Sequence, residues 1–220
     1  MTVEREVSPA IALQILTAEH SSLSTSRSLA WNEAFARAGM YLSALAGATI
    51  ALALVGQGSG FGSSFALFVL LILPVVIFVG ESTVIRLAGA NLTEATCIVG
   101  MNRIRGGYLE IAPDLGRFFV TSAHDDAEGI GVTTGLRQAG VPTLQILAGT
   151  PFVIGTINAV VLAVFIATAA LQLGANVAVA AAVGVVGAMV LALLHAALAR
   201  RQIASARANL QPIFPSPPDD

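Results

Sequence analysis

The sequence predicts an all-α polytopic membrane protein with four transmembrane helices, preceded by an N-terminal amphipathic cytoplasmic helix. Three observations lead to this class. The 220-residue chain is 55% hydrophobic and only 11% charged, with a mean hydropathy of +0.81, whereas soluble domains carry about 25% charged residues. Residues 38–80 and 138–199 contain no Asp, Glu, Lys or Arg. All eleven basic residues are arginines, and all of them lie outside these two intervals.

Each uncharged interval is long enough for two crossings, because a hydrocarbon core of about 30 Å needs ~20 apolar residues in a helix. The glycine-rich run 57–62 divides the first interval, and residues 173–176 divide the second. The predicted crossings are residues 38–55, 64–85, 143–171 and 177–199.

The arginines also predict an orientation, because cytoplasmic loops carry the excess of Lys and Arg. Arginines precede the first crossing, lie between the second and third, and follow the fourth, while the two other turns carry no charge. We therefore expect both termini and the central segment in the cytoplasm. Trp31 and Tyr41 flank the cytoplasmic end of the first crossing, where aromatic rings favour the interface. A lysine-free chain rich in Ala and Gly is typical of high-GC bacteria, so the expected location is the bacterial cytoplasmic (inner) membrane.

The first 37 residues are expected to form one or two amphipathic helices, with a break at residues 21–26 in the second case. Ser8 can cap a helix and Pro9 suits its first position, and apolar residues follow at helical spacing. The segment is expected to pack on the bundle or to lie among the headgroups; the alternative is an oligomerisation element. Because the first apolar run begins only near Ala38, no cleavable signal peptide is expected.

The second helix is expected to run past the membrane to about Ile104 and to end at Gly106-Gly107, with short helices or loops over residues 108–141. The tail, residues 211–220, holds four of the nine prolines and is predicted to be disordered. The predicted parts of the chain are the N-terminal segment 1–37, a first hairpin 38–87, a cytoplasmic segment 88–142, a second hairpin 143–199 and a tail 200–220.

Ridges of small residues predict how the helices pack, because helices in lipid associate through close contact rather than by hydrophobic force. The third and fourth helices carry such ridges and are expected to form a tight pair. The ridge residues are Gly155 and Ala159 on the third helix and Ala180, Gly184 and Ala188 on the fourth. A shorter ridge on the first helix consists of Ser43, Gly47 and Ala51. The second helix has bulky sides, and we expect it to face lipid or another subunit.

Glu81 is the candidate intramembrane charge, about one turn from the cytoplasmic end of the second helix. Charges inside a membrane are costly and usually mark a pathway or a partner. Glu81 either forms an acidic ring at the inner mouth of an oligomeric pore or hydrogen-bonds to Ser82, Thr83 or an arginine. His195, near the inner end of the fourth helix, is expected to serve packing only.

The third helix carries polar residues that could line a water path. The ion-path candidates there are Gln145, Thr156 and Asn158. The alternative for the same residues is hydrogen bonding between helices.

Other patterns exclude function classes. His124 with Asp125, Asp126 and Glu128 lacks a zinc geometry and is typical of a solvated acidic turn or a helix start. The glycines of residues 129–135 have neither the Rossmann spacing nor a Walker lysine. The one cysteine excludes an intramolecular disulfide, and a chain without lysine lacks the clustered cations that nucleic acids require. We expect no metal, no cofactor, no nucleic acid and no enzymatic activity.

Several stretches resemble a group of bacterial four-helix integral membrane proteins to which no activity is attached. The stretches are Leu16–Leu23, Arg27-Ser28, Arg37–Ser43, Asn102–Tyr108 and Ser122–Asp126. The resemblance implies the same four-helix architecture over most of the chain. The layout of a cytoplasmic helix followed by hairpins is also similar to predicted pore-forming effectors of bacterial defence systems.

These observations favour a self-associating channel or pore-like protein, a homo-oligomer surrounded by membrane lipids. The alternative is a non-transporting scaffold or accessory subunit that docks a cytoplasmic protein partner through residues 8–37 and 109–141. An intramembrane enzyme ranks third, because no second ionisable residue is expected beside Glu81.

Overall fold

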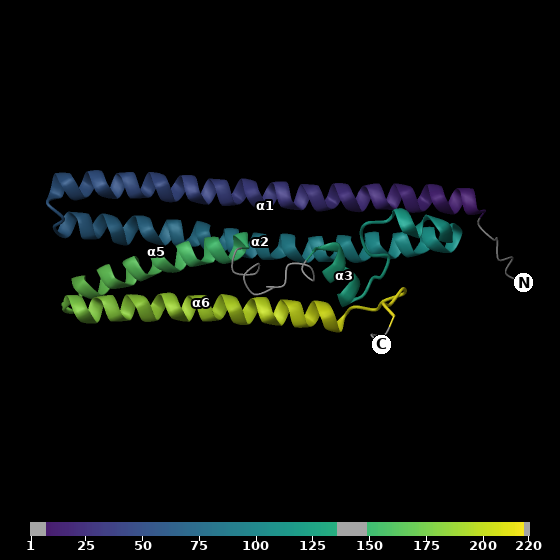
Figure 1. Cartoon of the computed structure of the whole chain (residues 1–220). Helices are drawn as coiled ribbons and strands as arrows, with labels where there is room; N and C mark the ends of the chain where they lie inside the picture. The colour runs from purple at the N-terminus through teal and green to yellow at the C-terminus, as the bar shows by residue number, and fades with distance from the viewer. Residues whose placement is uncertain (1–7, 136–148, 218–220) are drawn as a thin grey trace, which may run out of the picture. The chain divides into compact units, whose positions relative to one another are not determined.

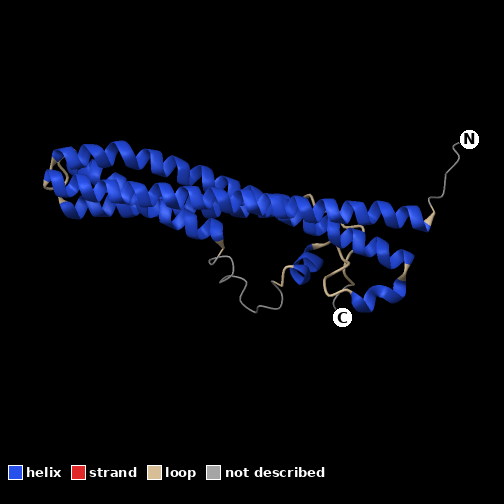
Figure 2. Cartoon of the chain, turned by 90° about the horizontal axis from the view of Figure 1, so that it is seen from above, coloured by secondary structure: helices blue, strands red, loops and turns tan. Residues whose placement is uncertain are grey.

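The computed structural model describes residues 8–135 and 149–217, which hold helices and loops and no strand (Figures 1 and 2). The helices, in chain order, are α1 (Pro9–Ser59), α2 (Ser63–Ile111), the 3-10 helix η1 (Pro113–Phe118), α3 (Ala127–Thr133), α5 (Thr150–Gln172) and α6 (Val177–Ala208). Within the described residues, α1, α2, α5 and α6 are long and apolar enough to cross a membrane. The prediction of an all-helical chain with four such helices is confirmed.

The N-terminal segment differs from its prediction, because α1 is one uninterrupted helix that is not clearly amphipathic. The hydroxyls of Ser21, Thr25 and Ser28 donate to the carbonyl oxygens four residues earlier, at 2.9 to 3.1 Å. These hydroxyls thus bond within the helix, to carbonyl oxygens of the preceding turn, and the helix continues through residues 21–26. Apolar residues such as Ile15 and Leu29 are exposed, so the helix has no single apolar face.

The helix boundaries also shift. Gly106 and Gly107 do not end the second helix, which continues to Ile111 before Pro113 opens η1. The third crossing begins at Thr150, with Gly149 as its N-cap and Pro151 in its first turn; residues 143–148 of the predicted span lie outside the described residues.

The chain divides into two compact units. One, here called the hairpin unit, comprises residues 33–89 and 146–204; the other, here called the tail unit, comprises residues 1–32, 90–145 and 205–220. The helices α1, α2 and α6 each contribute residues to both units.

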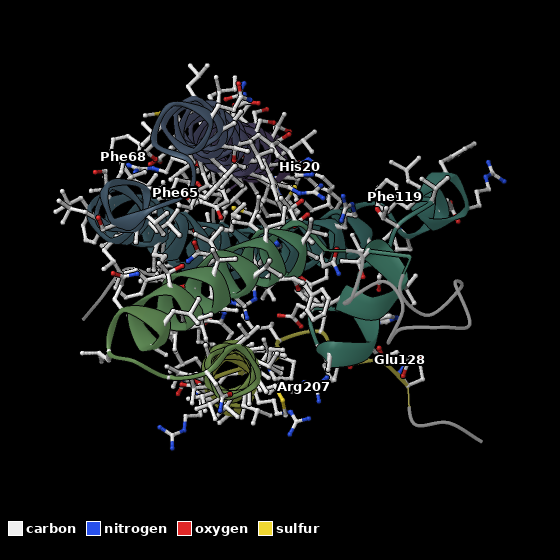
Figure 3. All side chains as sticks on the ribbon, turned by 90° about the vertical axis from the view of Figure 1, so that its left-hand side faces the viewer. His20, Phe65, Phe68, Phe119, Glu128 and Arg207 are labelled. Atoms are coloured by element: carbon white, nitrogen blue, oxygen red, sulfur yellow. The ribbon has the colours of Figure 1, made fainter. Side chains whose placement is uncertain are left out.

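Two helical hairpins make up the hairpin unit, and their turns lie at the same end (Figure 1). The first turn has positive φ at Gly60 and Phe61, and the Phe61 ring packs against Gly56, where a Cβ would lie only 2.4 Å from the ring. The second turn uses Gly174 at φ +88°. Figure 3 views the unit from this end, with Phe65 and Phe68 labelled on α2.

The small-residue ridges of α5 and α6 are on the inside of the hairpin unit. Gly155, Ala159, Ala180 and Gly184 are buried, and Ala188 is half-buried. A Cβ on Gly184 would lie 2.6 Å from the carbonyl oxygen of Ala163. The backbones of α5 and α6 therefore approach as closely as the predicted tight pair requires.

The ridge predicted on the first helix is wrong as a packing surface within the chain. Gly47 is exposed, and a Cβ built on it meets nothing within 4 Å. The buried side of this helix consists of Ala34, Ala38, Tyr41 and Gly56. On α2, the bulky residues Leu71, Val75 and Phe78 are exposed, whereas Phe65, Phe68 and Ile72 are half-buried. Part of the bulky side is thus free to meet lipid or another subunit.

The core of the tail unit lies between α2, α1 and α3. Cys97, Ile98 and Met101 are buried, with Leu23 and Ile130 packed against them. A carboxylate at the edge of this core, Glu94, accepts from the Arg27 guanidinium at 3.0 Å and from the Trp31 indole at 2.9 Å. In the described structure the Trp31 ring is thus bonded within the protein and not only an interface anchor.

Aromatic rings extend the tail unit along α2. The ring of Tyr108 lies 6.3 Å from His20 of α1 and 6.4 Å from Phe119, measured between ring centroids. His20 and Phe119 are both labelled in Figure 3. These contacts fold the η1 segment back onto α2.

The C-terminal tail is ordered through residue 217, which corrects the prediction of disorder from residue 211. Its backbone is bonded to Asp125, Asp126 and Arg103. The Phe214 ring covers Gly106, where a Cβ would lie 2.6 Å from the ring. This contact explains why α2 carries a glycine at that position without ending there.

Candidate ion-binding site

Glu81 of α2 is held between two other helices of the hairpin unit. Its Oε1 accepts from Nδ2 of Asn158 on α5 at 2.7 Å, and its Oε2 lies 2.8 Å from Nε2 of His195 on α6. The side chains of Glu81 and His195 are 30% and 20% exposed. Each carboxylate oxygen therefore has a partner inside the same chain.

Asn158 is the centre of the network. It is fully buried, and its amide donates to Glu81 and to the Ile77 carbonyl at 3.1 Å, while its Oδ1 accepts from the Tyr41 hydroxyl at 3.2 Å. A buried amide that makes all of these bonds avoids the cost of an unsatisfied polar group. Tyr41 is also fully buried, so its ring packs inside the bundle.

Together these contacts join all four long helices at one level. Tyr41 comes from α1, Glu81 from α2, Asn158 from α5 and His195 from α6. Hydrogen bonds between membrane helices add about 0.6 kcal/mol on average and up to about 1.7 kcal/mol. Such a layer fixes which faces of the four helices meet.

Two glycines leave the space that the polar side chains occupy. A Cβ on Gly80 would lie 2.2 Å from Oδ1 and 2.4 Å from Cγ of Asn158. A Cβ on Gly155 would lie 3.2 Å from Nδ1 of His195. Gly155 was predicted as a packing residue; here the group packed against it is the imidazole of the site.

Three of the four residues lie at the same depth, counted from the helix turns, and Asn158 precedes Gln172, the last residue of α5, by 14 positions. Glu81 and His195 each follow the first residue of their helix, Ser63 and Val177, by 18 positions, and Tyr41 precedes Ser59 by 18. At 1.5 Å per residue this is about 27 Å. In a hydrocarbon core about 30 Å thick, the site lies near the edge away from the turns.

The neighbouring residues that were expected to donate hydrogen bonds to the Glu81 carboxylate bind other groups. The hydroxyls of Ser82 and Thr83 both donate to the Val79 carbonyl, at 2.9 and 2.8 Å. Arg86 pairs with Glu33, which also accepts from Arg37 at 3.1 Å. The local alternative for Glu81 is therefore wrong, and the carboxylate serves contacts between helices.

Of the polar residues predicted along the third helix, Asn158 joins the site. The Thr156 hydroxyl is exposed and donates to the Phe152 carbonyl of its own helix at 2.8 Å. Gln145 lies outside the described residues. Sequence reasoning missed Tyr41 and His195; their equal spacing from the turns, which matches that of Glu81, was the signal that could have found them.

The acidic cluster of the tail unit has a structural role. Asp126 caps α3 by accepting from the Gly129 amide at 2.8 Å, as the helix-start prediction requires. Asp125 is fully buried, not solvated, and accepts from the amides of Ile213 and Phe214 and from Arg103. In the described parts of the chain, no group of three or more His, Cys, Asp or Glu side chains could hold a metal ion.

Both carboxylates of this cluster favour the ionised form. Burial would raise the pKa of Asp125, but hydrogen bonds from Ile213, Arg103 and Phe214 outweigh burial and lower the pKa. Burial would likewise raise the pKa of Asp126, and bonds from Gly129 and Ser216 lower it below the ordinary value.

Comparison of the chain with protein-family models, with curated proteins and with solved structures found no match.

Proposed function

We propose that this protein is a self-associating, channel-like membrane protein that moves protons, with the Glu81–His195 pair as its proton-binding site. The observation that carries the proposal is the 2.8 Å contact between a carboxylate and an imidazole within the hairpin unit. Ionisable residues inside a membrane are costly, and paired ones typically belong to ion pathways or proton relays. Imidazole is the side chain that ordinarily changes its charge between pH 5 and pH 8, and chains of Asp, Glu and His side chains form proton relays in pumps and transporters.

The donor set favours a proton over a metal cation. The site offers one carboxylate, one imidazole and one amide, and the amide uses Nδ2 to donate to Glu81. A hard cation such as Na⁺ or Ca²⁺ requires several oxygen ligands around one point. A proton requires only one acceptor, and Nε2 of His195 and Oε2 of Glu81 lie close enough to share it.

The site also differs from an acidic ring around a central axis. Because both oxygens of Glu81 bind within the chain, the contacts support one site in each subunit. Between the site and the turns, the inward-facing residues are apolar, among them Leu73, Val76, Val161 and Ala180. This apolar layer supports a resting state that is closed to protons, so that protons pass only when the helices rearrange transiently.

The direct test is proton flux into vesicles that hold the purified protein and a pH-sensitive dye. Wild-type vesicles should acidify after an external pH drop, and Glu81→Gln should slow acidification at least tenfold. Glu19→Gln is the matched control, because Glu19 is an exposed carboxylate on α1. Equal flux through wild type, both variants and empty vesicles would overturn the proposal.

Orientation and assembly belong to the same proposal. The arginine distribution supports cytoplasmic termini in an inner membrane, and the exposed bulky face of α2 supports contact with lipid or with a second copy. The mass of the intact assembly, measured by native mass spectrometry from mild detergent, tests self-association. A monomer would remove the oligomeric part of the proposal and leave the per-chain site to be tested by flux.

A scaffold that docks a cytoplasmic partner is the second candidate. It is favoured by the length of α1 and α2, 51 and 49 residues, which is more than twice the ~20 residues that a crossing needs. The surplus builds the tail unit. In a pulldown, loss of a partner on substituting exposed residues of 8–32, with unchanged vesicle flux, would favour this candidate.

A further inference from the structure

The C-terminal tail is bound by main-chain recognition. The amides of Ile213 and Phe214 donate to the two oxygens of Asp125, at 3.0 and 2.8 Å, and the Asp125 amide donates to the Phe214 carbonyl at 3.1 Å. Arg103 of α2 donates to Asp125 at 2.7 Å and to the Gln211 carbonyl at 3.0 Å. The buried carboxylate of Asp125 therefore accepts from two consecutive tail amides and from Arg103. The same Arg103 guanidinium also binds the tail at Gln211.

A second carboxylate holds the next part of the tail. The amide of Ser216 donates to Oδ2 of Asp126 at 2.6 Å, and its hydroxyl donates to Oδ1 at 3.0 Å. Asp126 also caps α3. The Phe214 ring lies between these two anchors, over the bare backbone of Gly106 on α2.

This arrangement connects α2 to the end of α6. Arg103 and Gly106 belong to α2, the helix that also carries Glu81. The tail follows α6, the helix that carries His195, with five residues, 209–213, between the helix end and Phe214. The two helices that meet at the Glu81–His195 contact are thus linked a second time through the tail.

We propose that residues 211–216 form a releasable latch that restrains α6 and keeps the Glu81–His195 site in its resting state. The proposal rests on the proposed proton conduction. Transport requires the site to change its access, and this requires α2 and α6 to shift against each other. A tail tied to α2 opposes this shift, so release of the tail raises the proton flux.

The anchors are suited to release. They are hydrogen bonds to the main chain and to the Ser216 hydroxyl, with one aromatic contact. The side chains of Ile213, Pro215 and Pro217 are exposed. A latch buried by apolar contacts on every side would open only on unfolding. This one can open while the core of Cys97, Ile98 and Met101 stays packed.

The substitution Gly106→Ala tests the latch, because it displaces the Phe214 ring. The added Cβ would lie 2.6 to 2.9 Å from three atoms of the Phe214 ring, so the ring must leave its place, whereas alanine inside α2 is a better helix former than glycine. Gly89→Ala is the matched control on the same helix, because a Cβ there meets nothing within 4 Å. Phe214→Ala is a second variant that removes the ring itself.

Two readouts on the full-length protein test the proposal. Hydrogen exchange measured by mass spectrometry should show protected tail amides in the wild type and in Gly89→Ala, and at least tenfold faster exchange in Gly106→Ala and Phe214→Ala. In vesicles, the same two variants should conduct protons at least threefold faster, and Glu81→Gln added to either should abolish the gain.

The outcomes separate the two proposals. A wild-type tail that exchanges as fast as a free peptide would overturn the latch. So would a variant whose tail is released while its flux stays at the wild-type value. A third outcome is that vesicles with the wild type, Gly106→Ala or Phe214→Ala conduct no more protons than empty vesicles. This outcome would overturn the proposed proton conduction, and with it the control of conduction by the latch.

Discussion

The carboxylate of Glu81 on α2 lies 2.8 Å from the imidazole Nε2 of His195 on α6, although 114 positions separate the two residues in sequence. Asn158 holds the other carboxylate oxygen and is in turn bonded to Tyr41. A single polar layer thus contains a residue from each of the four long helices. Ionisable and polar groups inside a membrane have a high free-energy cost and usually mark a functional site. The proposed proton binding is consistent with such a site.

The energetic coupling of this pair is measurable. In a double-mutant cycle of Glu81→Gln and His195→Gln, we expect a coupling of about 1.5 to 3 kcal/mol in the free energy of unfolding, the range of hydrogen bonds to charged groups. Unfolding of the purified protein in mixed micelles provides the measurement. Additive effects of the two substitutions would mean that the side chains do not interact.

Gly80→Ala should destabilise the hairpin unit by about 1 to 3 kcal/mol, the typical cost of overpacking. The new Cβ would lie 2.4 Å from Cγ of Asn158, so the whole side chain must turn away from Tyr41 and Glu81. Thermal unfolding in detergent measures the loss. An equal loss in Gly89→Ala, whose Cβ has open space, would show that the crowding at Asn158 is not the cause.

Gly184→Ala tests the close approach of α5 and α6. Its Cβ would lie 2.6 Å from a backbone oxygen, that of Ala163, and a backbone cannot turn aside as a side chain can. We expect a loss of about 1 to 3 kcal/mol. The same substitution at Gly47 of α1, where nothing lies within 4 Å, should leave the melting temperature in detergent unchanged; a larger loss at Gly47 would restore the first-helix ridge as a packing surface.

Acid should open the latch. Asp125 and Asp126 have pKa values lowered from 3.8, so their ionised forms stabilise the bound tail fully above pH 3.8. That stabilisation is lost as the pH falls below 3.8 and through the lowered values. A fluorophore on Pro217→Cys should keep its anisotropy from pH 7 to pH 5 and lose it below 3.8; a constant anisotropy down to pH 2 would contradict the account.

The sequence-based predictions succeeded for features that can be recognised from the residues of a single helix. Hydropathy and the uncharged intervals predicted four long apolar helices, and Glu81 and Asn158 stood out because they are polar within them. The contacts of those residues depend on which faces of four helices meet, and the pattern of one helix does not contain that information. His195 therefore looked like an isolated packing residue, and Tyr41 like an interface anchor.

The C-terminal tail shows a second reason why a sequence-based prediction was wrong. Four prolines among residues 211–220 predict disorder, but the prolines remove donors only at their own positions. The amides of Ile213, Phe214 and Ser216 remain, and these are the ones that Asp125 and Asp126 accept. Composition describes the average behaviour of such a segment. It does not reveal that carboxylates more than 80 positions earlier in the sequence lie where they can accept from the tail amides.

The orientation can be tested with single cysteines. Ala175→Cys, in the turn between α5 and α6, should react with a membrane-impermeant thiol reagent on intact cells, whereas Ala208→Cys, at the end of α6, should react only after permeabilisation. Cys97 is buried and should give little background. The reverse pattern would place the termini outside.

The most direct test of the central claim is infrared difference spectroscopy of the reconstituted wild-type protein, recorded between neutral and acidic buffer. If Glu81 is the proton-binding group, the spectrum contains a carboxyl band that disappears in Glu81→Gln, moves in His195→Gln and is unchanged in Glu19→Gln. A Glu81→Gln spectrum identical to that of the wild type would contradict the claim, because the protons would then bind elsewhere.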